Sequence, residues 1–206
     1  MRLSRKPQIK LGDHVFTCGQ TGSGKTYLTQ AYTAAFENVV VYDTKGMFNW
    51  GGFVKDVPVF ESLKELMEFK QGKCIYRPNI NELNKEYYER FFEWIYWRKN
   101  CWVNCDELMS FTDTTYIPFY LKAIYTRGRE RNTSVWGCTQ RPKTIPLVCM
   151  SEATHYFIFS LKLLADRKRV QEFIPHDEIL EEIQRDSHQF YYYNDKLDKP
   201  IKAKLV

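Results

Sequence analysis

The chain lacks a long apolar run, and its first residues lack the apolar stretch of a signal peptide. Even the apolar segment at residues 91–103 is interrupted by Glu93, Arg98 and Lys99. These absences argue against a membrane span and against secretion. We therefore expect a soluble, intracellular protein with no membrane span of its own.

Cysteine and histidine are present, but the spacing that binds metals or forms redox pairs is missing. The six cysteines include no C-x-x-C pair, and the four histidines show no ligand spacing. A zinc site is therefore not expected. Several cysteines lie in apolar, strand-like segments, which is typical of reduced thiols in a protein core.

Internal repeats and low-complexity segments are also absent from the 206 residues. A chain of this length can bury a core without disulfides or metals, so residues 1–206 are predicted to form a single domain. Residues 1–12 are polar and basic, and we expect them to form a tail or an edge strand.

Positive charge is concentrated in two places, although the net charge is only +5. Residues 122–143 hold six basic residues and one acidic residue, and the N-terminal segment adds Arg2, Arg5, Lys6 and Lys10. Such clusters indicate contact with the phosphates of a nucleotide or a nucleic acid. Solvated surface charge is the alternative for the N-terminal cluster.

Residues 19–26, Gly-Gln-Thr-Gly-Ser-Gly-Lys-Thr, match the phosphate-binding pattern G-x-x-x-x-G-K-[ST]. The glycines let the backbone wrap closely around an anion, and the positive end of a following helix favours negative charge. Residues 14–18 predict the entering strand and residues 27–36 the leaving helix. This setting favours a phosphate-binding loop over a glycine-rich turn with an incidental lysine.

The residues of this loop are candidate nucleotide contacts. Lys25 is expected to reach the β- and γ-phosphates of a nucleoside triphosphate, and the Thr26 hydroxyl to ligate Mg²⁺. The predicted nucleotide-binding residues are Gly19, Gln20, Thr21, Gly22, Ser23, Gly24, Lys25, Thr26 and Tyr27.

Two adjacent carboxylates, Asp106 and Glu107, follow the apolar run at residues 101–105. Carboxylates that end a strand lie at the carboxyl end of a parallel sheet, where α/β proteins bind ligands. Asp106 is suited to hold Mg²⁺ through its water shell, and Glu107 to orient and deprotonate an attacking water. An acidic pair alone is common, but its place after a phosphate-binding loop favours catalysis.

Gln140 ends a further apolar run, at residues 134–139. A glutamine there can hydrogen-bond the attacking water or the γ-phosphate, and so report which nucleotide is bound. Ordinary loop polarity is the alternative.

The remaining pattern alternates strands and helices, which predicts an α/β fold with a mostly parallel central sheet flanked by helices. The last two strands are expected to pair as an antiparallel hairpin. Further strands are predicted at 38–43, 57–60, 73–76, 154–161, 189–194 and 201–206, and helices at 61–71, 84–99, 116–125, 145–152, 166–173 and 177–185.

Aromatic residues recur at helical intervals in residues 84–99. A packed core or a subunit interface explains such a face better than stacking on nucleic-acid bases. The segment at 45–54 is predicted to be a loop near the nucleotide. Together with 111–116 it is a candidate for lining a pore.

Together these motifs resemble the FtsK/HerA superfamily of DNA-pumping P-loop ATPases. Residues 19–26 have that family's G-x-T-G-S-G-K-T wording, residues 106–107 match its acidic pair, and residues 128–142 match its G-R…T-Q-R-P segment. The similarity runs in order from about residue 13 to residue 173. The last match is the most specific, because it separates the chain from P-loop kinases and GTPases.

The resemblance implies a RecA-like fold with an additional strand and a catalytic glutamate, assembled as a ring with nucleotide between subunits. It further implies that Arg129 is the arginine finger that reaches a neighbouring subunit, with Arg127 and Arg131 as nearby alternatives. The residues implied for catalysis are Lys25, Glu107, Arg129 and Gln140, and those implied for Mg²⁺ are Thr26 and Asp106.

In size and layout the chain looks most like the genome-packaging ATPases of membrane-containing, tailless double-stranded DNA viruses. It lacks the membrane region and DNA-reading domain of cell-division translocases and the N-terminal barrel of archaeal DNA-end-processing members. This likeness implies a pentameric or hexameric ring that pumps double-stranded DNA into a procapsid. Capsid-vertex or membrane-associated packaging proteins are further implied partners, with a location in the host cytoplasm or the virion.

Three alternatives remain at this point. A phage assembly, secretion or conjugation-type ATPase belongs to the same superfamily. A P-loop nucleotide kinase shares the loop and a parallel sheet. A non-catalytic module that uses ATP only as a switch is the third, although Glu107 and Gln140 argue against it.

Overall fold

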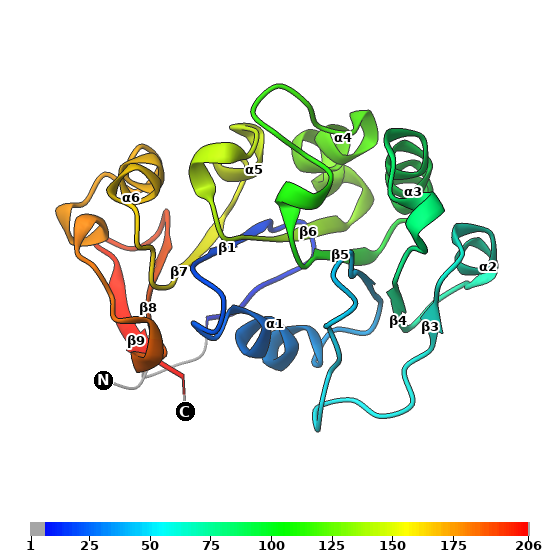
Figure 1. The fold of residues 1–206 in the computed structure, drawn as a ribbon, viewed down its shortest axis with the longest axis horizontal. Helices are drawn as coiled ribbons and strands as arrows, with labels where there is room; N and C mark the ends of the chain where they lie inside the picture. The colour runs from blue at the N-terminus through cyan, green and yellow to red at the C-terminus, as the bar shows by residue number, and fades with distance from the viewer. Residues whose placement is uncertain (1–6, 206) are drawn as a thin grey trace.

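A nine-stranded sheet forms the centre of the computed structural model, which describes residues 7–205 (Figure 1). The strand order is β3-β4-β2-β5-β6-β1-β7-β8-β9, with parallel pairs from β3 to β7 and antiparallel pairs beyond. The strands are β1 (Val15–Cys18), β2 (Val39–Tyr42), β3 (Val59–Phe60), β4 (Lys73–Tyr76), β5 (Cys101–Cys105), β6 (Thr133–Thr139), β7 (His155–Ile158), β8 (Gln189–Asn194) and β9 (Ile201–Lys204).

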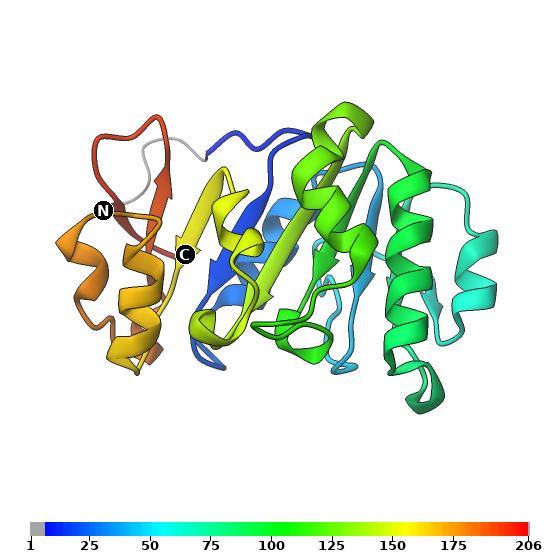
Figure 2. The same cartoon turned by 90° about the horizontal axis from the view of Figure 1, so that it is seen from above.

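The α-helices form two layers, with α1 on one face of the sheet and α2 to α6 on the other (Figure 1). Figure 2 shows α3 and α4 lying side by side along the strands. Short 3₁₀ turns join several elements. The α-helices are α1 (Lys25–Thr33), α2 (Leu63–Glu68), α3 (Lys85–Arg98), α4 (Phe119–Arg127), α5 (Val148–Ser151) and α6 (Leu164–Gln171), and the 3₁₀ turns are η1 (Ile80–Glu82), η2 (Leu108–Ser110), η3 (Gly128–Arg131), η4 (Pro142–Thr144), η5 (Asp177–Leu180) and η6 (Arg185–Ser187).

Two apolar clusters hold the layers together, because the central strands are apolar on both faces. In β2, Val40 and Tyr42 belong to the cluster beneath α2 to α6, whereas Val39 and Val41 belong to the cluster beneath α1. Alternate residues of a strand point to opposite faces, so an unbroken apolar run can serve both clusters. The run at residues 39–42 therefore predicts a strand covered on both sides, as observed.

The position of β6 decides how the polar loops meet. It lies between β1 and β5, and its residue Gly137 is paired with Phe16 on one side and Cys105 on the other. The strand that ends near Gln140 is therefore the additional strand of the predicted fold class, which is confirmed. The carboxyl ends of β1, β2, β5 and β6 consequently lie at one edge of the sheet.

Most predicted strands and helices are confirmed, with ends shifted by a few residues, but the helix at 177–185 is wrong. The chain there forms two separate turns, η5 and η6, and the intervening Glu181 has extended backbone. Helices this short are marginal in isolation, so packing decides their form. Ile179 and Ile183 are both buried in the core by the irregular chain.

Residues 7–13 and the aromatic helix each adopt one of the alternatives predicted for them. Residues 7–13 form no strand, which leaves the tail interpretation for the described part; Arg2, Arg5 and Lys6 lie outside the described residues. Helix α3 buries Phe91 and Phe92 completely, so its aromatic face belongs to the core.

All six cysteines are buried free thiols, as predicted. Within residues 7–205, no helix is both long and apolar enough to traverse a bilayer.

Candidate functional site

The phosphate-binding loop has a backbone that requires glycine. Gly19 has φ +152° and Gly24 has φ +110°, a region that L side chains rarely adopt. A Cβ atom at Gly19 would lie 2.5 Å from the Cβ atom of Phe159. The loop is fixed at its start, because the Gly19 and Gln20 amides donate to the carbonyls of Thr139 and Ser160 at 3.1 and 2.8 Å. The glycines therefore allow a tight turn, and the two hydrogen bonds hold it between the ends of β6 and β7.

Lys25 begins α1 and folds back over this loop. Its Nζ donates to the carbonyl oxygens of Gly19 at 2.7 Å and Gln20 at 3.0 Å. The side chain is nearly buried, and this burial lowers the pKa of Lys25. A partly dehydrated ammonium that is bonded to two carbonyl oxygens is well placed to bind a phosphate.

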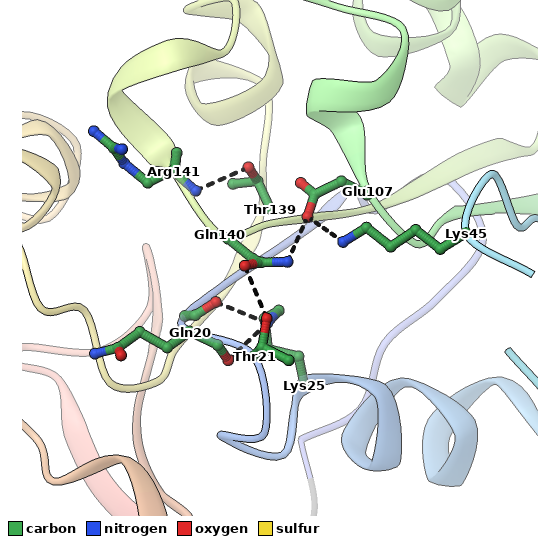
Figure 3. A network of polar contacts seen from close by, with 9 residues as sticks. Gln20, Thr21, Lys25, Lys45, Glu107, Thr139, Gln140 and Arg141 are labelled. Atoms are coloured by element: carbon green, nitrogen blue, oxygen red, sulfur yellow. Dashed lines mark hydrogen bonds and ion pairs between the residues drawn. The ribbon is translucent and has the colours of Figure 1, made fainter. Parts of the chain in front are cut away.

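A chain of hydrogen bonds joins the loop to the predicted catalytic residues (Figure 3). The Thr21 hydroxyl donates to Gln140 Oε1 at 2.9 Å, and Gln140 Nε2 donates to Glu107 Oε2 at 3.2 Å. Lys45 Nζ forms an ion pair with the same carboxylate oxygen at 2.8 Å. Residues from the ends of β1, β2, β5 and β6 thus form one connected polar group.

A cavity of about 560 Å³ opens beside this group. This volume is within the range of sites that hold nucleotide-sized ligands. Most of the predicted nucleotide contacts line it, whereas Gly19 and Ser23 are buried and Gln20 lines a neighbouring cavity. The lining residues are Thr21, Gly22, Gly24, Lys25, Thr26, Tyr27, Lys45, Met47, Asp106 and Gln140.

Thr26 and Asp106 both line this cavity, as the predicted Mg²⁺ ligands should. Burial, followed by the nearby Asp43, raises the pKa of Asp106 to about 6, and a bound cation would offset both effects. Glu107 Oε1 is buried and has no hydrogen-bond partner among the described residues. The hydroxyl of Thr26 and the carboxylate of Asp106 suit Mg²⁺, which prefers oxygen ligands and retains several waters.

Arg129 lies at the other edge of the sheet. It belongs to the turn η3, which precedes β6, whereas Gln140 follows that strand. Seven strand residues at about 3.3 Å each separate the two edges. The structure therefore does not bring Arg129 to the cavity of its own chain, and its action on a neighbouring subunit stays a prediction.

The two neighbouring arginines, Arg127 at the end of α4 and Arg131 at the end of η3, differ in how their side chains are packed. The Arg131 guanidinium is stacked over the rings of Tyr96 and Trp97, with centroid distances of 4.1 and 4.4 Å. Arg127 and Arg129 are exposed. The packing of Arg131 makes it the weakest of the three candidates for a contact with another subunit.

The Thr-Gln-Arg-Pro segment is held by a buried carboxylate. Arg141 Nε donates to Asp166 Oδ2 at 2.9 Å, and the Lys143 amide donates to the other oxygen at 3.0 Å. The Arg141 amide also donates to the Thr139 hydroxyl at 3.2 Å (Figure 3). These contacts fix the backbone that presents Gln140.

Lys45 is the site residue that sequence reasoning missed. The loop at 45–54 was expected near the nucleotide, but no role was assigned to this lysine. The loop is held by Asp43, whose carboxylate accepts from the amides of Met47 at 3.2 Å and Phe48 at 2.9 Å and pairs with Arg77 at 2.9 Å. A lysine two residues after an acidic strand end was the only available signal, and it did not show that β2 neighbours β5.

The loop at the end of β1, the strand β6 inserted between β1 and β5, and the parallel sheet define a P-loop NTPase fold. No family model and no curated protein matches the chain. Solved structures do match, and several of them are named as genome-packaging NTPases.

The genome packaging NTPase B204 from Sulfolobus turreted icosahedral virus 2, in complex with AMPPCP, aligns with a TM-score of 0.77 at 12% identity, over 96% of this chain and 100% of that one. The DNA-packaging ATPase B204 from Sulfolobus turreted icosahedral virus gives 0.75 at 14% identity, over 96% and 100%. The pCW3 conjugation coupling protein TcpA gives 0.64 at 14% identity, over 98% and 62%. At such identities the likeness shows a shared fold.

Proposed function

We propose that this protein is an ATPase that assembles as a ring and moves double-stranded DNA, as the motor that packages a viral genome into a procapsid. The observation that carries the proposal is the hydrogen-bonded chain from Thr21 through Gln140 to Glu107 beside the Lys25 cavity. Two structural neighbours named as packaging NTPases support the finer role.

In this proposal each residue has a defined part in ATP hydrolysis. Lys25 binds the β- and γ-phosphates, Glu107 accepts a proton from the attacking water, and Gln140 senses the γ-phosphate. Thr26 and Asp106 hold Mg²⁺, which neutralises phosphate charge when bound. The arginine that completes the site is Arg129 of a neighbouring subunit in a pentamer or hexamer.

The basic surface residues suit a partner with a phosphate backbone. Binding through lysine and arginine would be independent of DNA sequence and would weaken as salt rises. Further partners in this role are proteins of the capsid vertex or packaging proteins associated with a membrane, in the host cytoplasm or the virion.

A conjugation-type ATPase is the second candidate, because the coupling protein TcpA is also a structural neighbour. This candidate shares the ATP site and the DNA substrate but docks on a secretion channel in place of a procapsid. A nucleotide kinase would transfer phosphate to a small acceptor and would not respond to DNA.

The test is ATP hydrolysis with and without double-stranded DNA, together with the mass of the assembled particle. We expect a ring whose turnover rises with DNA and is lost in Lys25→Ala. An ATP hydrolysis rate that does not change with DNA, in a protein that does not assemble, would contradict the proposed motor. Phosphate transfer to a nucleoside monophosphate would favour the kinase.

A further inference from the structure

Lys45 connects Glu107 to the cavity that contains Lys25. Its Nζ lies 2.8 Å from Glu107 Oε2, and its side chain lines the same cavity as Lys25. The two side chains differ in how freely they can move, because the Lys45 side chain is 38% exposed and the Glu107 side chain only 6%. The ion pair can therefore open by movement of the lysine alone.

The hydrogen bonds of Glu107 show why the pair must open for catalysis. Oε2 accepts from both Lys45 and Gln140, while Oε1 is buried without a partner among residues 7–205. A carboxylate oxygen that is already bonded to an ammonium is a poor acceptor for the proton of a water. Because Oε1 is buried away from solvent and Oε2 is bonded to Lys45, Glu107 is not free to act as a base while Lys45 is in this position.

The backbone beneath Lys45 is fixed, so a change of position falls to its side chain. Asp43 holds the amides of Met47 and Phe48, and Arg77 holds Asp43. The lysine side chain has a flexible four-carbon stem that carries a point charge. A γ-phosphate placed beside Lys25 offers this charge a more strongly negative partner within the same cavity.

We propose that Lys45 is a γ-phosphate-sensing residue that pairs with Glu107 in the absence of a triphosphate and moves to the γ-phosphate when ATP binds, which releases Glu107. This inference rests on the proposed function. Lys45 thereby distinguishes ATP from ADP, because only ATP provides the competing phosphate. Gln140, which bonds the same oxygen, keeps Glu107 oriented after the lysine has left.

Affinities for ATPγS and for ADP, each with Mg²⁺, test the proposal by calorimetry on the intact protein. We expect Lys45→Met to weaken the binding of ATPγS by about tenfold or more, because it removes a hydrogen bond between charged groups. The affinity for ADP should be unchanged. Lys45→Arg should retain most of the preference for ATPγS. Lys55→Met, which removes an exposed charge from the same connection between β2 and β3 but outside the cavity lining, is the matched control and should behave as wild type.

A double-mutant cycle adds a measurement that a purely structural role would not move. Glu107→Gln removes the charge that holds the lysine, so it should tighten ATPγS in the wild-type background more than in the Lys45→Met background. Equal tightening in both backgrounds would show that the two residues act independently.

Equal weakening of ATPγS and ADP by Lys45→Met, or no change in either, would overturn this inference while leaving the ATPase intact. A wild-type protein that binds neither nucleotide would overturn both the inference and the proposed function.

Discussion

The two ends of strand β6 lie in very different surroundings. At its carboxyl end, Gln140 belongs to a hydrogen-bonded group that includes Glu107 and surrounds a cavity. At its amino end, Arg127 and Arg129 are exposed, and the turn η3 packs on the buried His14. The carboxyl edge is connected by hydrogen bonds within the chain, whereas the amino edge presents exposed arginines.

This difference between the two edges bears on how a second subunit would complete the nucleotide cavity. As far as residues 7–205 are concerned, its lining includes two lysines and no arginine. Phosphoryl transfer to water in P-loop enzymes commonly uses an arginine supplied from another subunit. The exposed amino edge of a second copy of the chain is the proposed source of this arginine.

The largest expected effect is at the amino edge. Arg129→Ala should reduce hydrolysis by about 10³-fold or more, because it removes charge stabilisation from the transition state of a neighbouring site. Mixing Arg129→Ala with Lys25→Ala subunits should restore some turnover, since one interface then has an intact pair. Two inactive variants that stay inactive when mixed would count against action between subunits.

At the carboxyl edge, Glu107→Gln should reduce the turnover number by about 10²- to 10⁴-fold, the usual contribution of a general base. The amide keeps the shape of the side chain, so ATP should still bind and remain uncleaved. Single-turnover assays with bound nucleotide measure both properties. Normal turnover in this variant would rule out the role assigned to Glu107.

His14 makes the stability of the amino edge depend on pH. Burial lowers the pKa of His14 to about 4, and its Nδ1 accepts a hydrogen bond from the Val135 amide at 3.0 Å. Because an unfolded chain binds this proton near pH 6.5, the unfolding free energy should fall by up to about 3 kcal/mol between pH 7 and pH 4. Urea unfolding across this range measures it, and His14→Gln should lack this part of the slope.

The smallest expected effect distinguishes the role of Arg131 from that of Arg129 in the turn η3. Arg131→Ala should lower the unfolding free energy by about 1 kcal/mol, because it removes the stacking on Tyr96 and Trp97. Hydrolysis should change little. A loss of hydrolysis as large as in Arg129→Ala, with no change in stability, would exchange the roles of the two arginines.

The local parts of the fold could be predicted from the sequence with good success. Runs such as residues 39–42 and 101–105 predict buried strands because uninterrupted apolar residues fit a sheet covered on both faces. The helix expected at 177–185 failed, since Ile179 and Ile183 satisfy the same apolar spacing and are buried without a helix. Short segments lack enough internal hydrogen bonds to choose their own form.

The sequence by itself determined the phosphate-binding loop, because the glycine conformations and the lysine that follows are local properties of eight consecutive residues. It also placed Asp106, Glu107 and Gln140 at strand ends. Only the tertiary structure decided that these ends meet, that Lys45 pairs with Glu107 across 62 positions of sequence, and that Arg129 lies at the opposite edge of the sheet. Strand order depends on contacts between distant segments, and no local pattern encodes which strands become neighbours.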